Sequence, residues 1–348
     1  MFLWGAEGAA LAQAQNVALE GLLLKLRPSV AVLGDPRQPV GAAALIDAQQ
    51  GLFVAHRDAV RGDTVQARIG DGTFRLKVLN LDTRTDLVLL AYQTPEGFPA
   101  GSQISVAETE PVAGSKVMVL LANGGLVGSF VGGNRFAVAG VNRQAIPVSE
   151  LRFETPPQLV GGALVISFEG KLLGTMGATL ARPGNVATVP LKTLNDVRGA
   201  VGGAGGAYRP GGGAPVLPGF PKLQSFYGGP GPAPLTVAYT PGLSVVRRVI
   251  EGFTSESHRA EFAALGVLVD ESFGGGAVIK LVVPDSPASH SGVRVGDVLL
   301  RVGDRPISRQ LDFVQALLAY RPGEHTTLRI RRDGVERTLE VVLARSKA

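Results

Sequence analysis

Short apolar runs separated by turn residues fill most of the first two hundred positions. Runs of four to six apolar residues at such spacing are typical of the strands of a β-sandwich or a pair of β-barrels. Helical patterns occur only at the edges of this region, at residues 17–26 and 191–197. The predicted strands include residues 29–33, 43–46, 87–90, 116–120 and 163–166.

The pattern stops at residues 201–235, where eleven residues are Gly, seven are Pro and only Arg209 and Lys222 are charged. Such a composition predicts a flexible linker that spans roughly 30–35 Å as a coil. A phosphate-binding loop at Gly202–Gly206 is not expected, because no strand leads into it and no helix follows it.

Apolar periodicity returns after the linker. Residues 243–253 fit a helix whose apolar stripe contains Val245, Val246, Val249 and Ile250. A second helix is predicted at 309–320, and the pair Asp333-Gly334 predicts a tight hairpin turn. The strands predicted here are residues 266–269, 277–283, 327–331 and 337–343.

Composition narrows the possible chemistry. The 348 residues are 45% apolar and 18% charged, which is enough apolar material for packed cores. No cysteine is present, so disulfides, thiolate metal sites and cysteine nucleophiles are excluded. The histidines His258, His290 and His325 have no carboxylate at ligand spacing, so neither a metal site nor a cofactor is predicted. The net charge of +5 is mild and comes from scattered residues, so nucleic-acid binding is not predicted.

The amino terminus carries a weak export signal. Ala10, Ala12 and Ala14 have the spacing of small residues before a signal-peptidase cut, but a basic start and a full apolar stretch are missing. Either a signal sequence precedes this numbering, or the segment is an ordinary Ala-rich start. No apolar run reaches the length of a membrane-spanning helix.

Several short blocks stand in sequence before the linker. They are Pro28-Ser29-Val30-Ala31-Val32, Gly41–Asp47, Asp71–Phe74, Asp82–Leu90, Val112–Val117, Val160–Val165 and Ala187-Thr188-Val189-Pro190. In this order they resemble HtrA/Deg-type serine proteases, and the last block falls where that family's final strand is expected. The resemblance implies a trypsin-like double β-barrel and acyl-transfer chemistry, which needs a serine nucleophile, a histidine base and an orienting aspartate.

The triad positions implied by this resemblance are degenerate. Asp86 stands at the position of the family's aspartate, but Asp58 stands where the histidine is expected, with His56 two residues earlier as an alternative base. Val160 stands at the nucleophile position, and a valine side chain has no lone pair to attack a carbonyl. Gln158 replaces the glycine of the oxyanion turn. No catalytic residue is therefore expected.

The region after the linker contains six further blocks, residues 264–267, 283–288, 291–299, 302–307, 321–324 and 331–334. In this order and spacing they resemble a PDZ domain of the bacterial protease-associated type. This resemblance implies a peptide, usually a chain end, that adds a strand beside a helix and places its carboxylate in a loop. The peptide-binding residues predicted in this way are Ala264, Leu265, Gly266, Val267, Leu311, Val314 and Leu318.

The sequence thus predicts a mostly β protein: an amino-terminal segment (1–25), a trypsin-like double barrel (26–199), a Gly/Pro linker (200–240) and a PDZ domain (241–345). The expected function is that of a non-catalytic adaptor, chaperone-like or regulatory subunit. One alternative is an active HtrA-type endopeptidase, and another is a PDZ scaffold whose barrels only oligomerise. Expected partners are peptides or protein carboxyl termini, with a trimer-like homo-oligomer or a complex with an active HtrA relative. The resemblance also implies export to the periplasm or another extracytoplasmic space.

Overall fold

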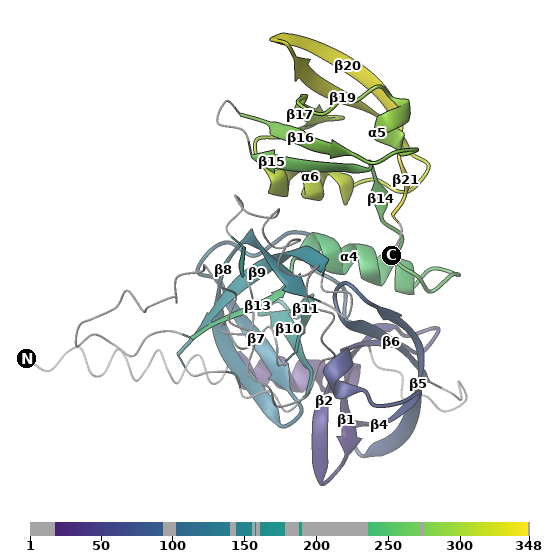
Figure 1. The fold of residues 1–348 in the computed structure, drawn as a ribbon. Helices are drawn as coiled ribbons and strands as arrows, with labels where there is room; N and C mark the ends of the chain where they lie inside the picture. Colours follow the sequence, from purple (N-terminus) through teal and green to yellow (C-terminus); the bar gives the residue numbers. More distant parts are fainter. Residues whose placement is uncertain are drawn as a thin grey trace, which may run out of the picture. The chain divides into compact units, whose positions relative to one another are not determined.

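The first six strands close into a barrel (Figure 1). The structure is a computed structural model that describes residues 18–92, 102–139, 144–154, 157, 161–177, 188–189, 236–271 and 275–346. Residues 18–26 are helical, and a 3₁₀ turn, η1 (Arg27–Ser29), leads into the barrel. The strands run in the order β1-β2-β3-β6-β5-β4. They are β1 (Val30–Asp35), β2 (Gln38–Asp47), β3 (Leu52–His56), β4 (Thr64–Ile69), β5 (Gly72–Asp82) and β6 (Leu87–Tyr92).

Strand β4 shows why these residues form a barrel wall. Its buried positions alternate with exposed ones, so Val65, Ala67 and Ile69 point into the core. At the end of the strand Gly70 adopts φ +57°, a left-handed conformation that favours glycine, and the chain reverses into β5. The remaining core includes Leu33, Leu45, Phe53, Leu76 and Leu90.

The second sheet has the order β11-β10-β7-β8-β9-β13. Its strands are β7 (Lys116–Leu121), β8 (Gly124–Ala139), β9 (Gln144–Phe153), β10 (Ala163–Ser167), β11 (Leu172–Met176) and β13 (Thr236–Pro241). A two-residue strand, β12 (Thr188–Val189), pairs with β8. The predicted last strand, Ala187-Thr188-Val189-Pro190, is thus not the strand at the end of the sheet. That place belongs to β13, which pairs with β9 over six residues.

Helix α4 (Leu243–Phe253) follows β13 and belongs to the same unit. Its apolar face, which includes Val246, Val249 and Phe253, is buried, and the helix contacts β9 and β11. Arg247 Nη1 donates to the carbonyl of Glu108 at 2.7 Å, and Asn80 Nδ2 of β5 donates to the carbonyl of His258 at 2.6 Å. Residues 236–260 thus belong to the first unit, and the carboxy-terminal stretch of the second unit begins at Glu261, whereas the sequence placed the start of the PDZ domain at residue 241.

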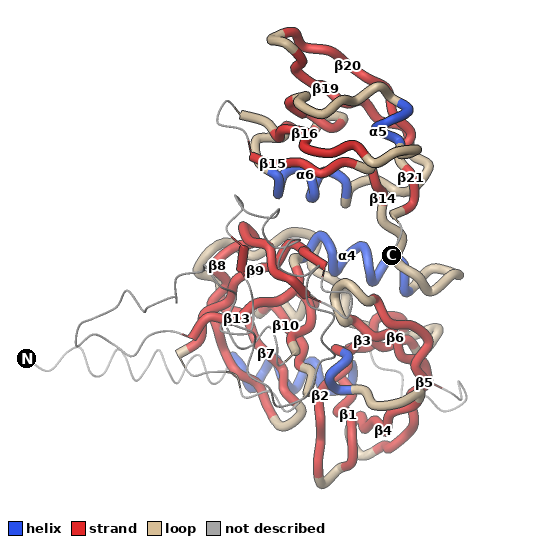
Figure 2. Tube along the Cα trace, in the orientation of Figure 1, coloured by secondary structure: helices blue, strands red, loops and turns tan. Residues whose placement is uncertain are grey.

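The second unit contains a six-stranded antiparallel sheet, in which β18 pairs with β17 beside the main path, a two-stranded sheet of β14 and β21, and two short helices (Figure 2). The sheet order is β15-β16-β17-β19-β20, so β15 lies at one edge. Asp333 and Gly334, both at positive φ, form the predicted two-residue turn between β19 and β20. The elements are β14 (Ala263–Ala264), β15 (Val267–Glu271), β16 (Ala277–Val282), α5 (Pro287–His290), β17 (Val298–Val302), β18 (Arg305–Pro306), α6 (Gln310–Leu317), β19 (His325–Arg332), β20 (Val335–Val342) and β21 (Ala344–Arg345).

A buried ion pair ties the loop before β17 to strand β19. The Asp297 side chain is only 1% exposed and accepts hydrogen bonds from Arg332 Nε at 2.7 Å and Arg332 Nη2 at 2.8 Å. The backbone N–H of Arg294 donates to the same carboxylate at 2.8 Å, and Arg332 Nη2 also donates to the carbonyl of Gly292. One carboxylate therefore holds the turn and the strand together.

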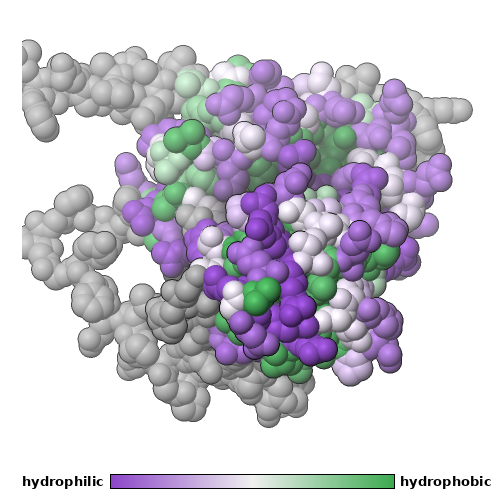
Figure 3. Space-filling view, turned by 90° about the horizontal axis from the view of Figure 1, so that it is seen from above, coloured by the Kyte–Doolittle hydropathy of each residue, from purple (hydrophilic) through white to green (hydrophobic). Residues whose placement is uncertain are grey.

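The mostly β fold class predicted from the sequence is confirmed. Two of the predicted segments, residues 191–197 and nearly all of the linker, lie outside the described residues. Within the described ranges, no helix combines the length and hydrophobicity needed to cross a bilayer. On the face shown in Figure 3, apolar residues lie scattered among hydrophilic ones.

Candidate functional site

The first candidate site lies where β3 ends and a 3₁₀ turn, η2 (Arg57–Ala59), begins. His56 is the last residue of β3 and is 4% exposed, while Asp58 lies within η2. The backbone N–H of Asp58 donates to His56 Nδ1 at 3.1 Å, and Asp58 Oδ2 lies 3.6 Å from the same nitrogen. Because Nδ1 accepts a hydrogen bond, the neutral ring carries its proton on Nε2.

Burial also decides the charge of this histidine. Desolvation by burial lowers the pKa of His56 to about 4. The Asp58 carboxylate opposes this shift, and the positive charge of Arg57 adds a smaller lowering effect. The imidazole is therefore uncharged near neutral pH. A base with so low a pKa has little driving force for taking a proton from a hydroxyl.

Two glycines from the second sheet enclose the His56 side chain. A Cβ on Gly177 would lie 2.1 Å from His56 Cε1 and 2.5 Å from Nε2. A Cβ on Gly162 would lie 2.6 Å from His56 Cβ. The ring therefore fits only because both positions lack a side chain, and its Nε2 edge faces Gly177.

Asp86 lies beside Arg57. Its backbone has φ +60°, a conformation that aspartate tolerates better than most residues, and its carbonyl accepts the Arg57 N–H at 2.8 Å. Its Oδ1 lies 3.5 Å from Arg57 Nε. The preceding residue, Thr85, donates its hydroxyl to Asp82 Oδ2 at 2.7 Å and so fixes the turn that presents Asp86.

The chain that follows the predicted nucleophile position packs closely on β2. Ala42 N–H donates to the carbonyl of Gly162 at 3.2 Å, and Gly41 and Gly162 form a parallel bridge. Val160 and Gln158 themselves lie outside the described residues. The structure thus places His56 and Asp58 where the barrel contacts the second sheet, beside Gly162 and Gly177, and it places Asp86 beside Arg57 of the same turn. Among the residues described, no cluster of three or more His, Asp or Glu side chains is arranged to hold a metal ion.

The second candidate site is the loop between β14 and β15. Gly266 has φ +81°, and a Cβ there would lie 2.2 Å from Ser286 Cβ. The carbonyls of Leu265 and Gly266 accept hydrogen bonds from Ala288 and Val283, both at 2.9 Å or less. The N–H groups of Leu265 and Gly266 donate to no acceptor among the described residues. These two adjacent backbone N–H groups, at the start of the edge strand β15, can therefore donate hydrogen bonds to an oxygen atom of a ligand.

Burial divides the predicted peptide-binding residues into two groups. Leu265 and Leu311 are 1% and 0% exposed and belong to the interior. Val267, Val314 and Leu318 are half-buried, as is Ala264. Helix α6 contacts β15, so the partly exposed residues of the two elements flank the same strand edge.

Comparisons with known proteins agree with this two-part architecture. The PDZ domain family model matches residues 256–343. A relative from Pseudomonas fulva (strain 12-X), named "Probable periplasmic serine endoprotease DegP-like", is 36% identical over 90 residues. The match covers 23% of this chain and 19% of the relative. The periplasmic serine endoprotease DegP of Escherichia coli (strain K12) is 23% identical over 314 residues, 88% of this chain and 57% of the relative. These matches span only part of the relatives' length.

Solved structures give the same fold. The HtrA-type protease AlgW with tripeptide has a TM-score of 0.62 at 14% identity, covering 95% of this chain and 98% of the other. The serine endoprotease from Yersinia pestis has a TM-score of 0.54 at 14% identity, covering 94% and 98%. The chain thus shares the fold of these HtrA-type proteases, a trypsin-like part followed by a stretch that matches the PDZ domain family, as the sequence predicted.

Proposed function

We propose that this chain is a non-catalytic HtrA-type protein that binds peptide ends through its PDZ domain and acts as an adaptor, chaperone-like or regulatory subunit. One observation carries the proposal: valine occupies position 160, where the resemblance of Val160-Gly161-Gly162 to HtrA/Deg-type proteases places the serine nucleophile. Without a nucleophile, a serine protease keeps only the modest rate enhancement supplied by binding and the oxyanion hole.

The surroundings of the base position support the same proposal. Asp58 occupies the 3₁₀ turn after β3, where the resemblance places the histidine base. A carboxylate is ordinarily a much weaker base than an imidazole and has less driving force for taking a proton from a serine hydroxyl. His56 is buried, and its Nδ1 accepts the Asp58 N–H. In a working triad that nitrogen donates its proton to the aspartate. Asp86 is instead paired with Arg57.

A fluorophosphonate probe is expected not to label the protein, and unfolded casein should survive incubation with it. Val160→Ser alone is expected to leave both results unchanged, because the base and the Gln158 turn also differ from what catalysis requires. An active HtrA relative assayed in parallel is the positive control. Covalent labelling of any serine in residues 1–199 would instead support the alternative of an active endopeptidase.

The PDZ domain supplies the proposed binding activity. An extended peptide can pair its backbone with the open edge of β15, and its carboxylate can accept the N–H groups of Leu265 and Gly266. The half-buried side chains of Val267, Val314 and Leu318 would contact the peptide, so an apolar terminal residue is expected. Leu265 and Leu311 would support this surface from the interior.

Gly266→Ala is expected to abolish measurable binding of free-acid peptides, because the new Cβ meets Ser286 and distorts the donor loop. Wild-type affinity should be micromolar, about −8 kcal/mol. Gly323→Ala is the matched control, because Gly323 also has positive φ (+87°) but has no neighbour within 4 Å of a Cβ. Calorimetric titration of free-acid and amidated versions of each peptide tests this. Equal binding of the two versions would contradict a carboxylate site.

The proposal also includes where the protein acts and which proteins it assembles with. The names of the relatives DegP and DegP-like describe periplasmic proteins, which supports export of this chain. A trimer-like assembly, or a mixed oligomer with an active HtrA relative, would bring several PDZ domains together. The alternative of a scaffold whose barrels serve only oligomerisation predicts the same peptide binding. It differs in that the isolated barrel unit would carry no client-holding activity.

A further inference from the structure

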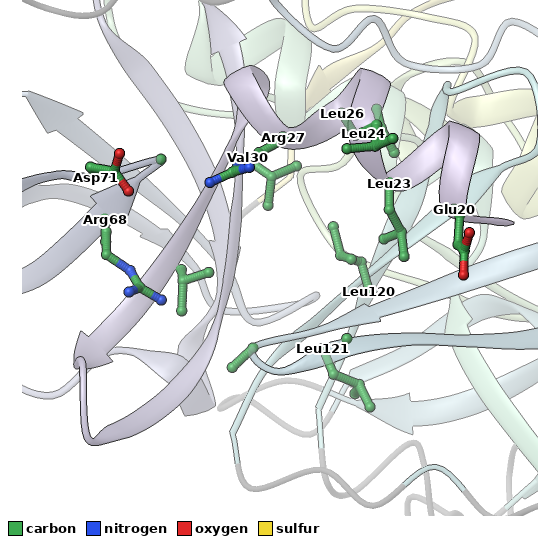
Figure 4. Close-up of a pocket in the computed structure, with 14 residues that line it drawn as sticks. Glu20, Leu23, Leu24, Leu26, Arg27, Val30, Arg68, Asp71, Leu120 and Leu121 are labelled. Atoms are coloured by element: carbon green, nitrogen blue, oxygen red, sulfur yellow. The ribbon is translucent and has the colours of Figure 1, made fainter.

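An open groove of about 620 Å³ lies between the helical residues 18–26, strand β1 and the β7–β8 turn (Figure 4). Its volume is in the range of small-molecule and peptide pockets. Leu23 of the helix points toward Leu120 of β7, and Leu24, Leu121 and Val30 complete much of the apolar lining. We call this the amino-terminal groove.

The groove presents apolar surface to solvent. Leu24 is 69% exposed, although it lies beside other leucines that line the same groove. The charged lining residues are two acidic and two basic ones, Glu20, Asp71, Arg27 and Arg68. In Figure 4, Arg68 and Asp71 lie at one end and Glu20 lies at the other. These opposite charges balance, so the groove favours an uncharged apolar occupant over an ionic ligand.

The chain supplies such an occupant next to the groove. Residues 1–17 lie outside the described part of the structure and join the helix whose Glu20 lines one end of the groove. They contain the apolar run Phe2-Leu3-Trp4, followed by Gly5 and Gly8, which allow the chain to reverse. From Trp4 to residue 18 the extended backbone reaches roughly 45 Å, ample for a return along a short helix.

We propose that Phe2-Leu3-Trp4 of the same chain docks in the amino-terminal groove. A tethered segment meets its site at an effective concentration on the order of millimolar, which a separate apolar partner rarely matches. Aromatic side chains bury large areas, so Phe2 and Trp4 are suited to covering the exposed leucines. The amino-terminal segment thereby shields a patch that would otherwise promote association.

Trp4 is the only tryptophan in the chain, so intrinsic fluorescence of the full-length protein reports on it alone. In the intact protein we expect blue-shifted Trp4 emission and several-fold weaker quenching by acrylamide than for a peptide of residues 1–17. Leu24→Asp places a charge in the groove at a site exposed enough to leave the fold intact, and should restore red-shifted, quenchable emission. Val112→Asp is the matched control, because Val112 is 79% exposed and does not line the groove.

Three outcomes would overturn the proposal. Trp4 in the wild-type protein could be as quenchable as in the free peptide. Leu24→Asp and Val112→Asp could change the emission equally. The blue shift could disappear on dilution, which would assign the groove to a segment from a second copy. Circular dichroism of both variants establishes that they are folded, and Leu121→Glu, on the opposite wall, should repeat the effect of Leu24→Asp.

Discussion

Asp297→Ala is expected to lower the free energy of unfolding of the PDZ domain by about 3 kcal/mol or more, the usual cost of breaking a buried ion pair from one side. The carboxylate is almost fully buried and receives hydrogen bonds from Arg332 and from the Arg294 backbone. Its loss removes both hydrogen bonds between Asp297 and Arg332 and leaves only the bond from Arg332 to the carbonyl of Gly292 in the loop before β17. Hydrogen exchange of the full-length protein, read over residues 261–346, measures the change.

The matched control is Glu336→Ala, which removes the partner of Arg329 in an exposed ion pair on the same sheet. Exposed pairs contribute about 0–1 kcal/mol, so little change is expected there. Equal losses in the two variants would contradict a special role for Asp297.

The same carboxylate makes the domain sensitive to acid. Burial alone would raise the pKa of Asp297, but hydrogen bonds from Arg332 and Arg294 and their positive charges hold that pKa below its ordinary value. The stabilisation is therefore complete above the unfolded-state pKa of about 3.9 and disappears as the pH falls through the lower folded-state pKa. In Asp297→Ala this acid-dependent part should be missing.

The barrel unit is expected to lose about 3 kcal/mol of unfolding free energy between pH 7 and pH 4 because of His56. The pKa of His56 is lowered from 6.5 to about 4 by burial, so the unfolded chain takes up the proton first. The stabilisation is thus fully present above pH 6.5 and is lost as the pH falls toward 4. Hydrogen exchange of β3 amides across this range measures it.

His56→Gln should flatten this part of the pH profile, since glutamine does not titrate. An unchanged profile in His56→Gln would show that other groups control the acid response. Direct titration of the His56 ring by NMR should give a midpoint near pH 4.

Much of the fold could be predicted because it depends on local patterns. Alternating apolar residues mark β4, and Asp333-Gly334 marks a turn whose geometry needs positive φ at both positions. The helix at 243–253 was predicted correctly from its apolar stripe. The sequence could not show which surface that stripe covers, so the helix was assigned to the PDZ domain and not to the barrels. A Gly/Pro-rich stretch shows where no core forms, but it does not show which core the next strand joins.

The sites could be predicted less well because they depend on residues far apart in the chain. The burial of His56 follows from Gly162 and Gly177, which lack the side chains that would fill its space. The sequence around Arg332 does not indicate its partner, yet its guanidinium pairs with Asp297, 35 positions earlier in the chain. Leu265 and Leu311 fit a groove pattern, yet complete burial places them in the interior. Each of these assignments requires knowing what packs on the residue.

Because β13 pairs with β9, the chain returns to the first unit at residues 236–260, after residues 191–235, before it enters the second. A chain cut anywhere in this stretch would still be held together by six paired residues and by the buried face of α4. The protein could therefore be produced as two complementing fragments that reassemble without a covalent link. Conversely, a PDZ fragment that starts at residue 241 would include helix α4 without the strands β9 and β11 that it contacts, so the apolar face of the helix would be exposed. A fragment that starts at Glu261 should therefore be the more soluble of the two.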